Sequence, residues 1–173
     1  MRTSTLYPRL PAILLLALFV CLGLAACAST YYSNVGKVAP EEYIIPAETG
    51  AGQQEWQTND LKIVYTVKET GESFTVSGTV SLKGYIKRSF PMAERFRLYI
   101  NYLDGNGKAL VSEDVSPVIG FRRVIPETLK LRDVPPAPEK AVAFTFSYIG
   151  TFSGGSNADE NSGDWEIYFN PFG

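Results

Sequence analysis

Few side chains in this sequence have the chemistry of a catalytic centre. Histidine is absent, and the two cysteines, Cys21 and Cys27, both lie near the N-terminus. Without histidine the chain lacks the usual general base near neutral pH and the commonest zinc ligand. Two carboxylates such as Asp114 and Glu127 can cleave glycosides when they are paired, but no motif selects one pair among the 18 acidic residues. We therefore predict a protein that is not an enzyme and that uses no cofactor and no metal.

The cysteine with the most informative surroundings is Cys27, which ends an apolar segment. Arg2 and Arg9 precede an uncharged run over residues 10–26, and small residues gather at the end of that run. A basic start, an apolar centre and a small-residue end are the layout of a secretory signal peptide. The run is slightly short for a transmembrane span, which needs about 20 apolar residues. We therefore predict a cleaved signal peptide over residues 1–26 rather than a retained membrane anchor.

The residues Leu24-Ala25-Ala26-Cys27 resemble the lipobox of bacterial lipoproteins, in which a leucine and two small residues precede an invariant cysteine. The resemblance implies that the chain is cut before Cys27 and that Cys27 carries acyl chains. Two or more acyl chains hold a protein stably in a bilayer, because each buried CH₂ contributes about 0.8 kcal/mol. By the same resemblance, Ala28 after the cysteine suggests sorting to the outer membrane, facing the periplasm.

Composition describes the part of the chain that would remain after cleavage. Arg2 and Arg9 would leave with the signal peptide, so 14 of the 16 basic residues would face all 18 acidic ones, and the resulting charge of about −4 argues against nucleic acid as a partner. Cys21 would leave with the signal peptide and Cys27 would carry lipid. The mature chain is therefore expected to contain no disulfide and to be stabilised by packing alone.

Residues 27–55 are predicted to form a flexible, lipidated tether. Pro40, Pro46 and a run of small and polar residues over 49–54 interrupt any helical or strand periodicity. Tyr43-Ile44-Ile45 is the apolar exception, so an extended first strand is the alternative for this segment. Residues 56–173 are predicted to form the folded domain.

Apolar and polar residues alternate through most of this domain, which is typical of half-buried strands. Residues 104–107, Asp-Gly-Asn-Gly, predict a tight hairpin turn. No amphipathic helix is expected. We predict an all-β fold, a two-sheet antiparallel β-sandwich that resembles the immunoglobulin-like class in strand count, with a closed barrel as the alternative. The seven expected strands are residues 61–68, 74–83, 96–102, 109–111, 128–131, 142–148 and 165–170.

Because antiparallel strands place successive loops at alternate ends, three long loops are expected at one end. These loops are residues 84–94, 116–127 and 151–163. Loops on a rigid scaffold are where such domains usually bind, so we predict a recognition surface there. Its aromatic and basic side chains would suit an anionic or sugar-like ligand. The candidate ligand-binding residues are Tyr85, Lys87, Arg88, Phe90, Arg122, Arg123 and Phe152.

Each of these residues also has a structural interpretation. Phe90 and Phe152 would serve equally as plugs over the end of the core, and the basic residues as solvated surface. Asp159, Glu160, Asn161 and Asp164 are oxygen ligands of the kind calcium prefers, but the spacing of a calcium loop is missing. Trp165 occupies an inward position of the last strand, so it is predicted to lie in the core.

The function expected from these features is that of an exported, lipid-anchored envelope lipoprotein. Its domain would act as a structural or protein-interaction module whose partners are the membrane, through the acyl chains on Cys27, and another envelope protein. The alternative is a module that binds a carbohydrate or an anionic ligand with the long loops at one end of the sandwich.

Overall fold

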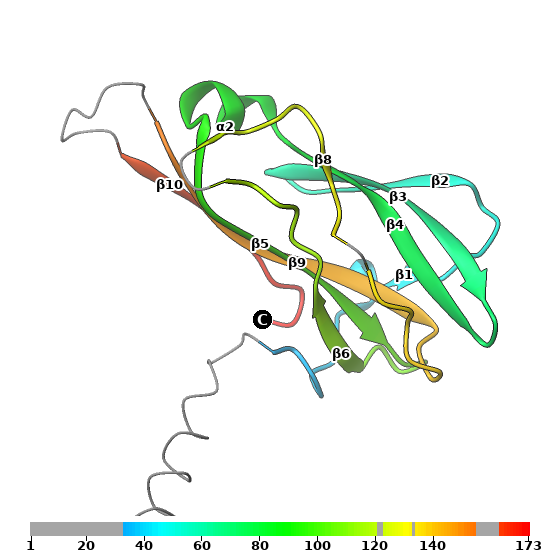
Figure 1. Ribbon diagram of the computed structural model, residues 1–173. Helices are drawn as coiled ribbons and strands as arrows, with labels where there is room; N and C mark the ends of the chain where they lie inside the picture. Colours follow the sequence, from blue (N-terminus) through cyan, green and yellow to red (C-terminus); the bar gives the residue numbers. More distant parts are fainter. Residues whose placement is uncertain (1–32, 121–122, 133, 155–162) are drawn as a thin grey trace, which may run out of the picture. The chain divides into compact units, whose positions relative to one another are not determined.

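The computed structural model describes residues 33–120, 123–132, 134–154 and 163–173 of the chain. These residues form two antiparallel β-sheets with one short α-helix at an end of the domain (Figure 1). The fold class predicted from the alternating pattern is therefore confirmed at this level: the domain is all-β, with two antiparallel sheets.

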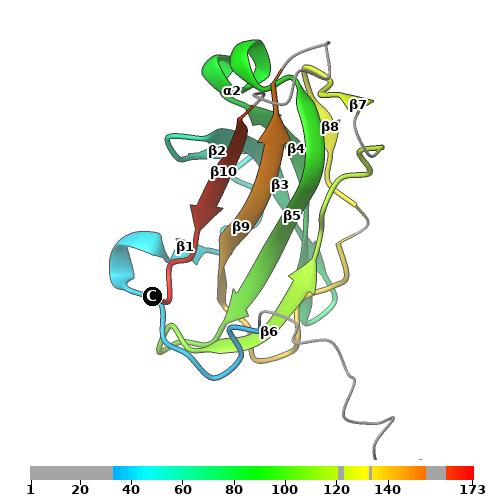
Figure 2. The ribbon, with the colours of Figure 1, turned by 90° about the vertical axis from the view of Figure 1, so that its left-hand side faces the viewer.

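The larger sheet has six strands among the residues that the structure describes. Its order is β1-β9-β5-β6, with β10 also paired to β9 and β7 paired to β5 (Figure 2). The long strands β5 and β9 lie side by side at its centre. The strands are β1 (Ile45–Pro46), β5 (Met92–Leu103), β6 (Ala109–Asp114), β7 (Arg123–Val124), β9 (Ala143–Ser153) and β10 (Asp164–Phe169).

The smaller sheet has four strands in the described part of the chain, in the order β2-β3-β4-β8. A 3-10 turn, η1 (Glu41–Tyr43), precedes β1, and a six-residue helix, α2 (Gly84–Ser89), follows β4. The strands of this sheet are β2 (Gln53–Gln57), β3 (Leu61–Thr70), β4 (Ser73–Leu82) and β8 (Leu129–Lys130).

Aromatic rings from the two sheets meet in the core between them. Tyr65 of β3 packs edge-on against Phe144 of β9 with ring centroids 5.5 Å apart, and Phe74 of β4 packs against Tyr102 of β5 at 5.6 Å. Trp56 of β2 lies 5.2 Å from Phe146. A fully buried large apolar side chain contributes about 1.5–3 kcal/mol, so this interlayer packing is the main stabilising term in a domain without a disulfide.

The predicted strands and the predicted hairpin all have counterparts in the structure. In the β5–β6 turn, Asp104 Oδ1 accepts hydrogen bonds from the backbone N–H groups of Asn106 and Lys108, at 2.9 and 3.0 Å. Gly107 adopts a φ of +72°, which a side chain would strain. The Asp-Gly-Asn-Gly sequence thus closes the turn as expected.

Gly78 occupies an inward position of β4 for a steric reason. It pairs with Tyr65 of β3, and a Cβ at this position would lie 2.3 Å from the carbonyl oxygen of Val64. Only a residue without a side chain permits this approach of the two backbones. Gly78 therefore fixes the separation between the two central strands of the smaller sheet.

The predicted tether is corrected over its described part, because residues 33–55 belong to the folded unit. Gly36 N–H donates to Ala109 O at 2.8 Å, and Ala39 N–H donates to Gly107 O at 2.9 Å. Strand β1 then pairs with β9, and β2 pairs with β3. The alternative of an extended first strand at 43–45 agrees with β1 only at Ile45, because Tyr43 belongs to η1. Strand β1 has only two residues, one of them Pro46, so the sequence shows no strand periodicity there.

Helix α2 was not predicted, since no amphipathic helix was expected from the sequence pattern. It spans six residues and buries one apolar side chain, that of Ile86. A single buried position is too few to produce a 3.6-residue repeat, so the pattern of the sequence contained no helical signal.

Candidate binding site

The described parts of the three predicted long loops lie at one end of the domain, as expected from the alternation of antiparallel strands. The ammonium group of Lys87 forms an ion pair with Glu127, which joins α2 to the segment before β8. A Cβ on Gly154 would lie 2.7 Å from the carbonyl oxygen of Ser89, so the end of β9 touches the end of α2. Figure 2 shows α2, the start of β10 and β7 at this shared end.

The predicted ligand-binding residues are distributed over several of these elements. Tyr85, Lys87 and Arg88 lie in α2, and Phe90 follows it directly. Arg123 begins β7 and pairs with Ala93, whereas Phe152 lies within β9. Arg122 lies outside the described residues.

An aromatic cluster forms where α2 meets β10. The ring of Trp165 stacks on that of Phe90 with centroids 5.4 Å apart and planes 21° apart. Tyr85 meets the same indole edge-on, at 6.2 Å and 85°. Trp165 is 42% exposed and Tyr85 is 37% exposed. The three rings, called the aromatic surface below, therefore combine fixed geometry with access to solvent.

The prediction that Trp165 lies in the core is wrong. The register of β10 places it opposite Phe152 and on the same face as the buried Ile167, as the alternation required. Trp165 lies near the start of β10, which pairs with β9 alone in the described part of the chain and so forms an edge of the sheet. There its ring contacts Phe90 and Tyr85 of the α2 region and stays partly open to solvent.

Phe152 is completely buried, which corrects the prediction that it contacts a ligand. Its ring packs against Phe96 of β5 with centroids 6.1 Å apart. Phe152 also lies across from Trp165 in the β9–β10 pair. It therefore supports the aromatic surface from the core, in line with its alternative interpretation as a plug.

A shared carboxylate fixes the position of the Tyr85 side chain. The Tyr85 hydroxyl donates a 2.6 Å hydrogen bond to Asp60 Oδ1, and the Tyr148 hydroxyl donates a 2.7 Å bond to Asp60 Oδ2. Asp60 lies in the turn between β2 and β3, while Tyr148 lies in β9. This network, called the Asp60 network below, ties both sheets to α2.

The tyrosines of the Asp60 network have raised pKa values. Burial is the largest cause of the raised pKa of Tyr85, and the hydrogen bond and negative charge of Asp60 add to it, raising the pKa to about 12. Burial likewise raises the pKa of Tyr148, and Asp60 acts in the same direction. Both hydroxyls therefore remain protonated donors at neutral pH.

The basic residues of this end differ in their availability. Lys87 is committed to Glu127, as described above. Arg88 and Arg123 are exposed, and neither forms an ion pair with another described residue. The guanidinium of Arg88 lies back over Gly84, at the first turn of its own helix. The structure thus leaves two exposed cations at this end of the domain, Arg88 on α2 and Arg123 on β7.

Acidic side chains give no metal centre in the part of the chain that the structure describes, where no group of three or more potential ligands is found. Asp164 is exposed at the start of β10, whereas Asp159, Glu160 and Asn161 lie outside the described residues. The two carboxylates considered for glycoside cleavage pair with different cations, Asp114 with Arg97 and Glu127 with Lys87.

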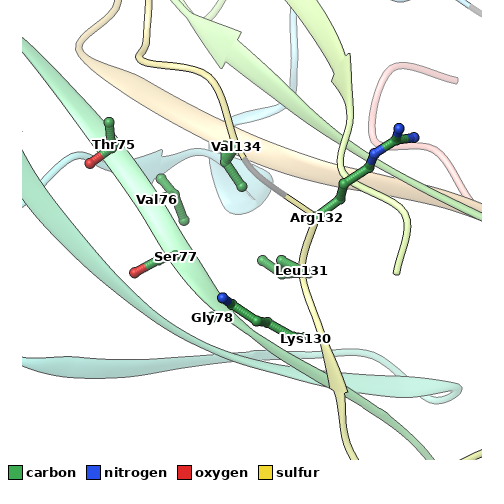
Figure 3. A pocket seen from close by; sticks show the side chains of 8 residues that line it. All are labelled: Thr75, Val76, Ser77, Gly78, Lys130, Leu131, Arg132 and Val134. Atoms are coloured by element: carbon green, nitrogen blue, oxygen red, sulfur yellow. The ribbon is translucent and has the colours of Figure 1, made fainter. Parts of the chain in front are cut away.

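A separate pocket of about 280 Å³ lies along the edge of β4 that faces β8 and the segment after it (Figure 3). The segment after β8 hydrogen-bonds to that edge at two points, Leu131 N–H to Gly78 O at 3.0 Å and Ala137 N–H to Phe74 O at 2.8 Å. Between these points the pocket is lined by residues 75–78, 130–132 and Val134. None of the predicted ligand-binding residues lines it.

Cys27 and the lipobox-like sequence lie outside the described residues, so the structure adds nothing to that prediction. Among the residues that are described, none of the helices has the length and apolar character required to cross a membrane.

Sequence reasoning missed Asp60 and Tyr148, although Tyr148 carried a usable signal. It ends an inward-facing series that contains Phe144 and Phe146, and a buried tyrosine requires a partner for its hydroxyl. Asp60 gave no signal, because its role depends on hydrogen bonds from Tyr85 and Tyr148, which lie 25 and 88 positions further along the chain.

Comparison of the chain with protein-family models, with curated proteins and with solved structures finds no match.

Proposed function

We propose that this chain is a lipid-anchored envelope lipoprotein whose immunoglobulin-like β-sandwich acts as a protein-interaction module. The sequence Leu24-Ala25-Ala26-Cys27, at the end of a signal-peptide-like segment, supports the anchor. Acyl chains on Cys27 would hold the domain at the outer membrane, facing the periplasm. The domain would then present its α2 end to a partner in the envelope.

The observation that carries the interaction proposal is the partly exposed Trp165, stacked on Phe90 and flanked by Tyr85. Tryptophan and tyrosine are enriched among the residues that dominate the binding energy of protein interfaces. An aromatic side chain that is already ordered loses little conformational entropy when a partner covers it. The Asp60 network provides this order for Tyr85.

A carbohydrate is the second candidate ligand, and one observation favours it. Trp165 lies between Asp164 and Glu166 in the sequence of β10, and all three are exposed. The negative face of an indole attracts the C–H groups of a sugar ring, and this attraction would come from Trp165 without Asp164 and Glu166, whose side chains point to the opposite face of β10. The exposed ring of Trp165 supports a glycan-binding module that uses the same aromatic surface.

Fluorescence separates the two ligand classes, because the chain has two tryptophans. A Trp56→Phe variant reports on Trp165 alone, and a Trp165→Phe variant reports on Trp56 alone. A glycan ligand should change the emission of the Trp56→Phe variant and leave that of the Trp165→Phe variant unchanged. A protein partner should instead be recovered by crosslinking in the envelope, and Trp165→Ala should abolish its recovery. If the glycan still bound to Trp165→Phe, or the partner were still recovered with Trp165→Ala, at the level of the parent chain, the aromatic surface would not be the binding site.

The anchor has its own test, the intact mass of the protein extracted from membranes. A mass equal to residues 27–173 plus acyl chains supports the anchor, and Cys27→Ser should release the protein from the membrane. A mass that corresponds to an unmodified chain starting at another residue would contradict the anchor, while the binding proposal would still be tested separately.

A further inference from the structure

A second polar pocket lies on the outward side of β5, away from the inward-facing Trp165. Its volume is about 280 Å³, and three arginines line it: Arg95, Arg97 and Arg132. Glu94, Phe96, Ser116 and residues 117–119 form the rest of its wall. Three arginines in the wall of one pocket are a local excess of positive charge in a chain whose net charge is −2.

A β-bulge explains why two of these arginines share one face. In the β5–β9 pair, Ala93 pairs with Phe152 and Arg95 pairs with Thr151, so Glu94 is an extra residue. In a regular strand without the bulge, Arg95 would share the inward face of Ala93, which lies two residues before it. The bulge shifts the alternation, so that Phe96 and Leu98 are buried while Arg95 and Arg97 are exposed on the outward face.

The third arginine is positioned by backbone hydrogen bonds. Arg132 N–H donates to Val115 O at 3.1 Å, and Val115 N–H donates to Leu98 O at 2.9 Å. These bonds place Arg132 beside the continuation of β6, next to the strand that carries Arg97. Figure 3 shows the Arg132 guanidinium directed away from the other side chains that line the β4 pocket.

The charges of this pocket are not balanced by its carboxylates. Arg97 forms an ion pair with Asp114 at 2.9 Å. Arg95 and Arg132 form no ion pair with any residue that the structure describes. The carboxylate of Glu94 accepts a hydrogen bond from Ser153 at 2.8 Å, and Asp114 also accepts the Ser116 backbone N–H at 2.9 Å. Two guanidinium groups therefore remain available to a ligand.

We propose that this pocket, the arginine pocket, binds an oxyanion, the phosphate or carboxylate group of a small molecule or of a lipid headgroup. Guanidinium groups donate paired hydrogen bonds in a plane, which matches the oxygens of phosphate and carboxylate. The pocket is large enough for one such group and its first substituent, and too small for most drug-sized ligands, whose sites begin at about 300 Å³. This proposal is independent of the function proposed for the aromatic surface.

Isothermal titration calorimetry on the full chain in non-ionic detergent micelles tests the proposal, with glycerol phosphate and citrate as soluble probes. We expect saturable binding, and we expect Arg95→Gln and Arg132→Gln each to weaken it by about tenfold, the effect of removing a hydrogen bond between charged groups. Arg88→Gln is the matched control, because it removes the same charge from an exposed site on α2. It should change the affinity by less than about twofold, since screening weakens distant charges.

Phosphatidic acid in the same micelles distinguishes the source of the oxyanion. Tighter binding of phosphatidic acid than of glycerol phosphate, lost in Arg132→Gln, would assign a lipid headgroup. Equal binding of the two would assign a soluble ligand. The absence of saturable binding for every probe would overturn the proposal, and so would equal weakening by Arg95→Gln, Arg132→Gln and Arg88→Gln. Unchanged melting temperatures confirm that the variants are folded.

Discussion

The indole of Trp165 stacks on the ring of Phe90 at a centroid distance of 5.4 Å, and this contact joins the edge strand β10 to the segment that leaves α2. The stack lies at the end of the core and leaves 42% of Trp165 exposed. It therefore stabilises two peripheral elements and, at the same time, orders a side chain that a partner can cover.

Replacing Phe90 by alanine should disorder the aromatic surface with a modest loss of stability. Loss of a stacked pair removes about 0.5–1.5 kcal/mol beyond the buried area. In a Trp56→Phe background the emission of Trp165 should shift to longer wavelength, because the indole becomes more hydrated. Phe90→Leu is the control, since it keeps apolar volume but removes the aromatic stack. Unchanged emission in Phe90→Ala would show that the stack does not order Trp165.

Replacing Asp60 by asparagine should destabilise the domain and loosen α2 together. The carboxylate accepts hydrogen bonds from Tyr85 and Tyr148, and bonds to a charged group contribute about 1.5–3 kcal/mol each. Urea denaturation should therefore show a lower free energy of unfolding. Asp164→Asn, which removes an exposed carboxylate from β10, should leave that free energy nearly unchanged. Equal effects of the two substitutions would contradict a structural role of the Asp60 network.

Stability should fall at alkaline pH because Tyr85, Tyr102 and Tyr148 have raised pKa values in the folded chain. The folded-state pKa of Tyr85, about 12, lies above its ordinary value of 10.0, so the contribution of the protonated phenol is complete below pH 10. As the pH rises from 10 towards 12, the unfolded chain loses this proton first and the stability declines. Tyr102 and Tyr148 act in the same direction, because burial raises their pKa values too.

Urea denaturation at a series of pH values measures this decline. Tyr85→Phe should make the decline shallower between pH 10 and 12, because one of the contributing phenols is removed. An identical slope in the variant and in the parent chain would show that Tyr85 titrates normally.

Gly78→Ala should destabilise the smaller sheet strongly. The new Cβ would lie 2.3 Å from the carbonyl oxygen of Val64, a backbone atom that cannot rotate away. Overpacking of this kind costs about 1–3 kcal/mol. Gly105→Ala is the matched control, because nothing lies within 4 Å of a Cβ there. Thermal denaturation should show a lower melting temperature for Gly78→Ala alone, and equal melting temperatures would contradict the steric argument.

The sequence pattern predicted the regular part of the fold, because buried and more exposed side chains alternate along strands such as β3 and this alternation is visible in the sequence. Leu61, Ile63, Tyr65 and Val67 are buried along β3 just as their spacing indicates. The pattern failed where burial depends on the end of an element. Trp165 has the correct face but lies on the edge strand β10 and is 42% exposed, and Phe152, predicted as a ligand contact with a core plug as the alternative, is buried against Phe96.

The sites were less predictable than the strands, for a physical reason. Tyr85 and Phe90 could be named from their loop, but Asp60 and Trp165 join them only through tertiary contacts. The arginine pocket depends on the bulge at Glu94, which reverses the alternation that sequence analysis assumes. The spacing of residues along the chain shows neither the tertiary contacts of Asp60 and Trp165 nor the position of the bulge.

Site-specific photocrosslinking in intact cells tests the central claim most directly. A photoreactive residue in place of Arg88 lies beside the aromatic surface, and one in place of Lys62 lies on the smaller sheet, where Lys62 pairs with Glu55 at the exposed surface. The account predicts one defined adduct from position 88, its loss when Trp165→Ala is added at equal protein level, and no such adduct from position 62. An adduct of unchanged yield in the Trp165→Ala background, or the same adduct from position 62, would contradict the claim that this protein binds its partner through the aromatic surface.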